Sequence, residues 1–344
     1  MKVGIIGLPG SGKSTIFQAL IQQGKEIIQK GQNRIGTVRV PDVRVDELRS
    51  RYPQGKTIYA QVEYFLPEVL GHKRENIYDQ KIWPRIKESD ALIHVVRNFS
   101  GFGLPDPTPA QDFNQLDQEL VFEDLVVLEK RLERLLLDKK RGVKKNPEEL
   151  NLLVECQKLL DNGMPLRKSP ELSTSRLLKG YAFVSAKPVL VLFNNEDEDD
   201  QLPKIEKLTS SEDCMVIRGK LEQELSQMPD EEAKEFLKEF NIPASAMARV
   251  IKRSYTLLGL LSFFTVGSDE VKAWTIRAGT KAIDAAGAIH SDIKKGFIRA
   301  EVLSYEDLMD AGNYPEARKR GTLRLEGKNY IVGDGDIIEF RFNI

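Results

Sequence analysis

A glycine-rich segment near the start of the chain, Gly-Leu-Pro-Gly-Ser-Gly-Lys-Ser at residues 7–14, restricts the fold more than any other stretch. It follows a short apolar run at residues 3–6 and leads into a segment with helical apolar periodicity at residues 16–20. A strand, a glycine-rich loop and a helix, in this order, form the context in which the pattern G-x-x-x-x-G-K-[ST] binds phosphate. We therefore predict a P-loop in an α/β fold, in preference to a glycine turn without a ligand.

The residue types in this segment predict its ligands. Glycines allow the backbone to approach a phosphate closely, and the N-terminus of the following helix adds a favourable partial charge. Lys13 is expected to reach the β- and γ-phosphates of a nucleotide, and the Ser14 hydroxyl is expected to ligate Mg²⁺. The expected cofactors are therefore ATP or GTP with Mg²⁺, and the expected metal ligand is Ser14. The predicted nucleotide-binding residues of this segment are Leu8, Pro9, Gly10, Ser11, Gly12, Lys13, Ser14 and Thr15.

Length and composition describe a globular protein with two or three domains. The chain has 344 residues, of which 30% are charged, and its formal net charge is -1. This balance predicts neither nucleic-acid nor membrane binding for the chain as a whole. Cys156 and Cys214 lack metal-ligand spacing, which indicates reduced thiols. No apolar run approaches transmembrane length and no leader is expected before the P-loop strand, so we expect a cytoplasmic protein that binds no membrane.

Apolar runs alternate with helical segments along the first two thirds of the chain. Near-continuous runs at residues 91–96, 188–193 and 214–217 are typical of parallel strands that are covered on both faces. Residues 58–65 alternate like a further strand. Together these runs predict a mostly parallel, doubly wound sheet. His94 lies inside the first run, and we interpret it as a core residue rather than a ligand.

Two regions depart from this pattern. Within residues 116–179, apolar side chains between 121 and 135 recur at spacings of four and three and resume after a basic turn at 141–147. This predicts an antiparallel helical hairpin inserted into the α/β domain, which either packs or contacts a partner. Residues 257–344 contain short alternating runs, including one at 330–332, that predict a small mixed sheet with one main helix. Basic side chains gather in this last region, and charge alone leaves RNA contact and simple solvation both open.

Several separated stretches share one further pattern. They are the P-loop, residues 90–97, a helical piece at 129–133, and the C-terminal stretches 260–265, 273–277, 296–302 and 335–342. Over essentially the whole chain they resemble the YchF/Obg-like ATPase family. The resemblance implies a translation-factor-type P-loop G domain at 1–115 and 180–256, a helical hairpin insertion at 116–179, and a C-terminal TGS domain with a β-grasp fold at 257–344. It also implies a preference for ATP over GTP and association with ribosomes.

The chain departs from this family where nucleotide binding is coupled to hydrolysis. The family carries Asp-x-x-Gly after the strand that ends near residue 65, and its Asp positions Mg²⁺ while its Gly contacts the γ-phosphate. Here the stretch reads Leu66-Pro67-Glu68-Val69, with Glu68 as the remaining candidate for a metal contact. The family's switch I threonine would fall near Lys30, and the asparagine of its P-loop is Gly10 here. Because these groups supply electrostatic stabilisation, hydrolysis is expected to be slow or absent.

The loop that would read the base is also altered. In GTPases, Asn-Lys-x-Asp places a carboxylate against guanine, and the corresponding stretch here is Asn-Asn-Glu-Asp-Glu at residues 194–198. An ungapped match pairs Asn194 with Asp197, and a shift of one residue pairs Asn195 with Glu198. A solvated acidic loop without base contact is the third interpretation. A later loop with Arg218 and Gly219 occupies the place where the family contacts the base, which completes the predicted nucleotide-binding set.

Three functions remain open at this stage. The first is a purine-nucleotide-binding protein of the YchF type, with weak ATP or GTP hydrolysis, that acts as a monomer with ribosomes or RNA through its TGS domain and arm. The second is a catalytically degraded nucleotide-binding module that works as a scaffold. The third is a small-molecule kinase, which the P-loop alone would allow and which the TGS-like end argues against.

Overall fold

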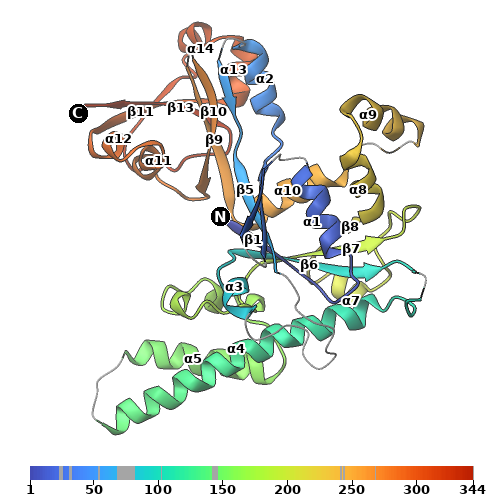
Figure 1. Cartoon of the computed structure of the whole chain (residues 1–344). Coiled ribbons are helices and arrows are strands. Elements are labelled where there is room, and N and C mark those ends of the chain that lie inside the picture. Colours follow the sequence, from blue (N-terminus) through green and yellow to red (C-terminus); the bar gives the residue numbers. More distant parts are fainter. Residues whose placement is uncertain are drawn as a thin grey trace. The chain divides into compact units, whose positions relative to one another are not determined.

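The computed structural model describes residues 1–344 except 23–25, 31–32, 53–54, 68–81, 102, 142–145, 241, 243–244, 268 and 344. The chain divides into two compact units, one formed by residues 1–38 and 63–250, the other by residues 39–62 and 251–344. Each unit has its own β-sheet (Figure 1).

The sheet of the first unit has the strand order β2-β3-β5-β1-β6-β7-β8. Its central strand β1 pairs in parallel with β5 and β6, and β6, β7 and β8 continue the parallel arrangement. The apolar runs form these strands because both faces of the sheet are covered, and every residue of β7 is buried. The predicted parallel α/β sheet is confirmed. The strands are β1 (Lys2–Ile6), β2 (Glu26–Lys30), β3 (Asn33–Arg39), β5 (Gln61–Leu66), β6 (Ala91–Asn98), β7 (Val189–Asn195) and β8 (Asp213–Ile217).

Helices connect these strands, and an apolar core fills the space between them and the sheet. Phe193, Val191 and Leu92 are fully buried members of this core. His94 is 1% exposed and its ring stacks on Phe113 at 5.1 Å, so it is a core residue as predicted. Burial lowers its pKa to about 3, so its ring is neutral. The helices are α1 (Lys13–Gln22), α3 (Trp83–Lys87), α6 (Pro170–Ser173), α7 (Glu206–Thr209), α8 (Gly219–Gln227), α9 (Asp230–Glu239) and α10 (Ala246–Leu257), which runs on into the second unit.

The predicted helical hairpin is also confirmed. Helices α4 (Pro109–Lys140) and α5 (Pro147–Asp161) lie side by side, and the a/d side chains between them form their own buried cluster (Figure 1). The side chain of Asn146 caps α5 by accepting the N–H of Glu148. Asp124 on α4 is fully buried and accepts the N–H groups of Val184 and Ser185 at 2.8 and 2.7 Å, which fixes the hairpin to the segment leading into β7.

The second unit contains a mixed sheet with the strand order β12-β11-β13-β9-β10-β4. Helix α11 packs on its apolar face through Ala282, Ala285 and Ala286, small residues that allow a close approach to the strands. The strands are β4 (Lys56–Ile58), β9 (Leu260–Val266), β10 (Glu270–Arg277), β11 (Phe297–Ser304), β12 (Arg324–Glu326) and β13 (Asp336–Phe342). The helices are α2 (Val43–Arg51), α11 (Ala282–Ile289), α12 (Ser291–Lys295), α13 (Tyr305–Ala311) and α14 (Tyr314–Arg320).

Residues 39–62, which the predicted division assigned to the P-loop domain, cluster with this second unit. Arg44 holds them there: it forms ion pairs with Asp42 and Asp334 at 2.8 and 2.9 Å and lies over the ring of Phe264. Strand β4 adds a parallel pairing with β10.

Two strand predictions are wrong. The single strand expected at residues 58–65 is two strands, β4 and β5, because two residues between them let the chain change from one sheet to the other. The strand expected at Tyr330–Val332 is an isolated bridge between Ile331 and Lys281. Among the described residues, no helix has the length and apolar character needed to cross a membrane.

Candidate functional site

The loop between β1 and α1 is shaped for close approach of a ligand to its backbone. Gly12 has φ +91°, and a Cβ atom at this position would lie 2.2 Å from Nδ2 of Asn194. Any other residue would therefore clash as well as strain the backbone. The loop leads directly into the first turn of α1, whose free N–H groups carry the positive end of the helix dipole. This is the geometry of an anion-binding loop.

Lys13 is the principal charge of this loop. Its side chain is 9% exposed, and its Nζ atom donates a hydrogen bond to the Leu8 carbonyl at 2.7 Å. Burial lowers its pKa to about 8, because the charged ammonium loses hydration that no carboxylate among the described residues replaces. A buried ammonium in this setting can bind a phosphate, whose charge would restore the lost stabilisation.

The hydroxyl groups of the loop differ in their surroundings. The Oγ atom of Ser11 is buried and has no hydrogen-bond partner among the described residues, although its N–H donates to Leu8 at 3.2 Å. Ser14 is exposed on the first turn of α1, as a group that contacts a metal and water would be. Pro9 and Gly10 are exposed at the tip of the loop.

Asn194, at the end of β7, connects this loop to the start of α8. Its Nδ2 donates to the Ser11 carbonyl at 3.1 Å, and its Oδ1 accepts the N–H of Gly219 at 2.9 Å. The side chain is 4% exposed, so it acts as a buried clamp between two loops. Gly219 must be small for this contact, because a Cβ atom there would lie 2.7 Å from Oδ1 of Asn194.

The next residues of the loop after β7 are held by the protein itself. Asn195 accepts from Asn98 at 2.9 Å and donates to Gln201 at 2.8 Å. Asp197 accepts the N–H of Leu221 at 3.2 Å, and its second carboxylate oxygen lies 3.9 Å from Nζ of Lys220. Asn194 thus has a structural role, and the Asp197 carboxylate contacts the first turn of α8.

Arg218 also belongs to this loop system. Its guanidinium donates to the Asp197 carbonyl at 3.2 Å, which stabilises the turn. Arg218 therefore shapes the loop after β7 and does not line the cavity described next.

A cavity of about 580 Å³ opens beside the P-loop, within the range of a small-ligand site. Five predicted residues line it: Gly12, Thr15, Asn194, Asn195 and Asp197. The remaining predicted P-loop residues lie outside its lining. Glu198, from the alternative pairing with Asn195, also lines it, and sequence reasoning missed the other lining residues, which are Phe99, Ser100, Glu196, Lys220 and Gln223.

Phe99 is the most informative of the missed residues. It follows β6, so it lies at the same sheet edge as the loop after β7, where parallel α/β sheets bind ligands. Arg97, which is 8% exposed, donates to the carbonyls of Phe99 and Asp106 at 3.2 Å and holds this loop in place. A signal existed in the sequence, since an aromatic residue directly after a predicted strand is placed to stack on a planar ligand.

The end of β5 lacks the carboxylate that the family pattern requires. Leu66 is 4% exposed and belongs to the apolar interior. Glu68 and Val69 lie outside the described residues, and Lys30, at the expected switch I position, falls in β2. The described part of the chain contains no cluster of three His, Cys, Asp or Glu residues that could hold a metal.

These observations test which groups the site can hold. The glycine cradle, the buried ammonium of Lys13 and the unpartnered Ser11 hydroxyl fit the phosphates of a nucleotide. For Mg²⁺ the described residues offer the single hydroxyl of Ser14, which fits a metal that arrives with the phosphates rather than a separate metal centre.

Comparisons with known proteins identify the family of this chain. Residues 260–343 match the family YchF-GTPase_C, whose description is "Protein of unknown function (DUF933)". The chain is 35% identical over 365 residues to the "Ribosome-binding ATPase YchF" of Bacillus subtilis, with 100% of both chains covered. It is 36% identical over 361 residues to the protein of the same name from Haemophilus ducreyi, with 100% of this chain and 99% of that one covered.

A solved structure agrees as well. The "Structure of the Schizosaccharomyces pombe YchF GTPase" superposes with a TM-score of 0.87 at 27% identity, over 99% of this chain and 97% of that one. Because the sequence matches to the relatives extend over the whole chain at more than 30% identity, the chain belongs to the YchF family.

Proposed function

We propose that this protein binds a purine nucleoside triphosphate at the P-loop, prefers ATP to GTP, and hydrolyses it slowly or not at all. One observation carries the second half of this proposal. At the end of β5, where the family pattern has a metal-positioning Asp, the side chain is the buried Leu66. Leucine can neither accept a hydrogen bond from metal-bound water nor stabilise charge on a transferring phosphoryl group.

The phosphates are assigned to the loop before α1. Backbone N–H groups of residues 10–15 would surround them, with Lys13 on the β- and γ-phosphates and the buried Ser11 hydroxyl as a further donor. On binding, the Lys13 ammonium would exchange its bond to the Leu8 carbonyl for a charge-assisted bond to phosphate. Asn194 holds the loop in this shape before the ligand arrives.

The base is assigned to the cavity between Phe99 and the loop after β7. Phe99 offers an aromatic face for stacking. Asp197, which would read guanine, already accepts the N–H of Leu221 and faces Lys220. Because these contacts already occupy part of the carboxylate, the two donors of guanine would have to compete with them, which favours adenine.

Ser14 is assigned as the protein ligand of Mg²⁺. When bound with the nucleotide, Mg²⁺ neutralises phosphate charge. The exposed Ser14 hydroxyl can occupy one coordination position of the metal. Leu66, at the end of β5, offers no carboxylate for a second position. We therefore expect Mg²⁺ to strengthen binding more than it supports turnover.

Calorimetric titration with ATP, GTP, ADP and GDP, with and without Mg²⁺, tests this proposal. We expect saturable ATP binding that is tighter than GTP binding, with ADP close to ATP, because the described residues at the end of β5 offer no group that could contact the γ-phosphate. Binding of GTP tighter than ATP would contradict the base assignment. No binding of any nucleotide would contradict the site itself.

We further propose that the protein works in the cytoplasm as a monomer that associates with ribosomes. The support is the name of the relatives, together with exposed cations on the C-terminal unit such as Lys319 and Lys328. Arg318 and Arg324 are less free, since they lie 3.3 and 3.7 Å from Glu301 and Asp336.

Co-sedimentation with ribosomes tests this part of the proposal on the full chain. The double variant Lys319→Glu, Lys328→Glu should weaken salt-sensitive association, because phosphate contacts depend on cation number. The matched double variant Lys204→Glu, Lys207→Glu, on an exposed part of the first unit, should keep it. If both variants sediment like the unaltered protein, the contact lies elsewhere.

A further inference from the structure

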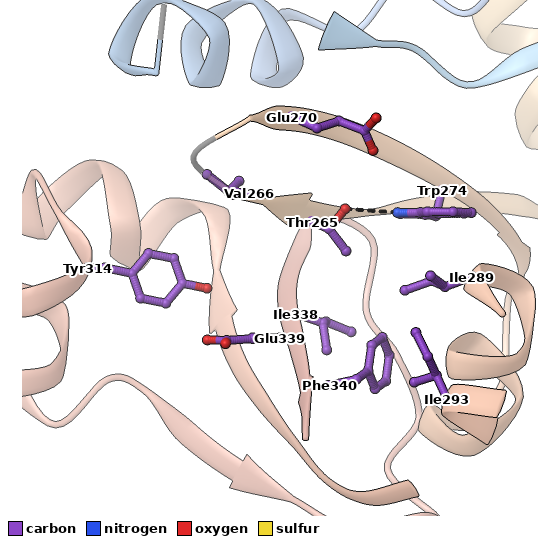
Figure 2. Close-up of a pocket in the computed structure, with 11 residues that line it drawn as sticks. Thr265, Val266, Glu270, Trp274, Ile289, Ile293, Tyr314, Ile338, Glu339 and Phe340 are labelled. Atoms are coloured by element: carbon purple, nitrogen blue, oxygen red, sulfur yellow. Dashed lines mark hydrogen bonds between the residues drawn. The ribbon is translucent and has the colours of Figure 1, made fainter. Parts of the chain in front are cut away.

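A second cavity lies in the C-terminal unit, where two neighbouring strands of its sheet separate (Figure 2). Strands β9 and β13 run parallel, and in the described part of the chain their register consists of the pair Phe264 and Ile337. Beyond this pair, residues 265–266 line one side of the cavity and residues 338–340 line the other. The cavity has a volume of about 470 Å³, which suits a short segment or a small ligand.

Beyond the pair Phe264 and Ile337, the pairings of these two strands in the described part of the chain lie on their outer sides. There β9 pairs with β10, and β13 pairs with β11 as far as Phe342. The inner edges of residues 265–266 and 338–342 therefore face the cavity, and open strand edges are templates for an added extended segment. Gly267, which donates to the Glu270 carbonyl at 2.9 Å, turns the β9–β10 hairpin at one end of the cavity.

One wall of the cavity is apolar. It consists of Trp274 and Phe340 from the strands, with Ile289 and Ile293 from the region of α11 and α12 (Figure 2). The indole N–H of Trp274 is already satisfied, because it donates to Oγ1 of Thr265 at 2.9 Å. This wall therefore offers contact area rather than hydrogen bonds, as a pocket for an aliphatic side chain does.

The opposite wall is polar and acidic. Glu339 precedes Phe340 on β13, so the two side chains point to opposite faces of the sheet. Figure 2 shows the Tyr314 hydroxyl directed toward Glu339, with Glu270 at the rim. Burial, together with the charge of Glu339, raises the pKa of Tyr314, so its hydroxyl keeps its proton. Glu339 is 52% exposed and pairs with Arg341 at 2.9 Å, which leaves one carboxylate oxygen for another cation.

We propose that this cavity binds an extended peptide of a partner protein in which Lys or Arg alternates with aliphatic residues, inserted as a strand between β9 and β13. Alternate side chains of a strand point to opposite faces. An inserted segment would thus direct its aliphatic residues to Trp274 and Phe340 and its basic residues to Glu339. Both open edges would gain backbone hydrogen bonds. Because one wall is apolar and the other is acidic, the cavity would favour segments in which aliphatic and basic residues alternate.

Tryptophan fluorescence of the full chain tests this proposal. The chain has two tryptophans, Trp83 and Trp274, and the substitution Trp83→Phe in the first unit leaves Trp274 as the reporter. The probe is an acetylated, amidated peptide of four Lys-Val repeats. It should change Trp274 fluorescence saturably, and a peptide of four Lys-Pro repeats should bind on the order of tenfold more weakly, because proline has no N–H to pair. A peptide of four Glu-Val repeats should not bind.

Charge variants sharpen the assignment. Glu339→Lys should weaken the Lys-Val peptide by about fivefold at low salt, because it replaces attraction with repulsion at an exposed position. Glu239→Lys, the same change at an exposed site of the first unit, is the matched control and should leave affinity unchanged. Unchanged thermal unfolding of both variants shows that folding is intact.

Several results would overturn the proposal. Equal affinity for the Lys-Val and Lys-Pro peptides would exclude strand insertion. Equal affinity for the Lys-Val and Glu-Val peptides would exclude the acidic wall as the selector. If n-butylammonium bound as tightly as the Lys-Val peptide, the cavity would be a site for small amines. No response of Trp274 to the Lys-Val peptide would remove the site.

Discussion

The loop after β1 and the end of β5 belong to neighbouring parallel strands of one sheet, yet their chemistry differs completely. The loop after β1 presents a buried ammonium, a buried unpartnered hydroxyl and a glycine with φ +91°. The end of β5 presents Leu66, which is 4% exposed and apolar. One strand end is shaped for phosphate, and the described residues of the other offer no group that could act on it.

This difference separates two properties that usually occur together in P-loop proteins. Phosphate binding needs groups from residues 8–15 and the support of Asn194, all of which are in place. Phosphoryl transfer also needs a metal-positioning carboxylate from the adjacent strand, and this group is replaced. Nucleotide binding and hydrolysis can therefore be tested as independent properties of this sheet edge.

The largest expected effect comes from removing the phosphate-binding side. Lys13→Ala should weaken ATP by about 10²- to 10³-fold in calorimetry, because it removes charge-assisted bonds to two phosphates. Lys207→Ala, on the exposed face of α7, is the control and should bind normally. Retained affinity in Lys13→Ala would place the nucleotide outside the P-loop.

The next largest effect is expected from removing the Asn194 side chain, which clamps the P-loop to the start of α8. Asn194→Ala leaves the Ser11 carbonyl and the Gly219 N–H without their partner, which should lower the free energy of unfolding by about 2–4 kcal/mol. ATP affinity should fall about tenfold, since the loop is no longer pre-shaped. Asn151→Ala, at an exposed position of α5, should change neither denaturant unfolding nor ATP affinity. A variant that unfolds like the unaltered protein would show that the clamp is unimportant.

Restoring the missing carboxylate should reduce the contrast between the two strand ends. Leu66→Asp should release phosphate from ATP and Mg²⁺ about tenfold faster than Leu66→Asn, which has the same shape without the charge. Both variants should melt at lower temperature, because each places a polar group in an apolar environment. Equal phosphate release by the two variants would show that a carboxylate at this position does not limit hydrolysis.

The smallest effect is a pH dependence of binding. Lys13 has its pKa lowered to about 8 by burial, so the free protein loses this positive charge as the pH rises past 8. ADP affinity should therefore fall by up to about tenfold per pH unit above pH 8, with uptake of a proton on binding. The pH dependence of folding stability has the opposite sign to that of ADP affinity. The unfolded chain holds this proton up to its ordinary, higher pKa, so the contribution of Lys13 to stability becomes more favourable above pH 8. Constant ADP affinity from pH 7 to 9.5 would contradict the assignment of Lys13.

Local patterns predicted much of this molecule. Glycine spacing indicated the P-loop, and apolar runs at residues 91–96 and 188–193 indicated β6 and β7, because burial on both faces is visible in each short segment. The packing of α4 against α5 was predictable for the same reason, because the apolar side chains between them recur at spacings of four and three in the sequence.

Contacts between distant segments were not predictable in this way. β4 has three residues and exists because β10, more than 200 residues later, offers it an edge. Arg44 binds Asp334 across a comparable separation. Phe99 lines the cavity because β6 and β7 are neighbours in register. Its position after a predicted strand is visible in the sequence, whereas the strand that lies next to it is not.

A single-turnover measurement of phosphate release, with protein in excess over ATP and with Mg²⁺ present, tests the central claim most directly. We predict that the unaltered protein binds ATP completely and that Lys13→Ala does not, while phosphate appears on the order of 10² times more slowly than with a family member whose Asp-x-x-Gly is intact. Release as fast as in that relative would contradict the claim that the two strand ends have separated binding from hydrolysis.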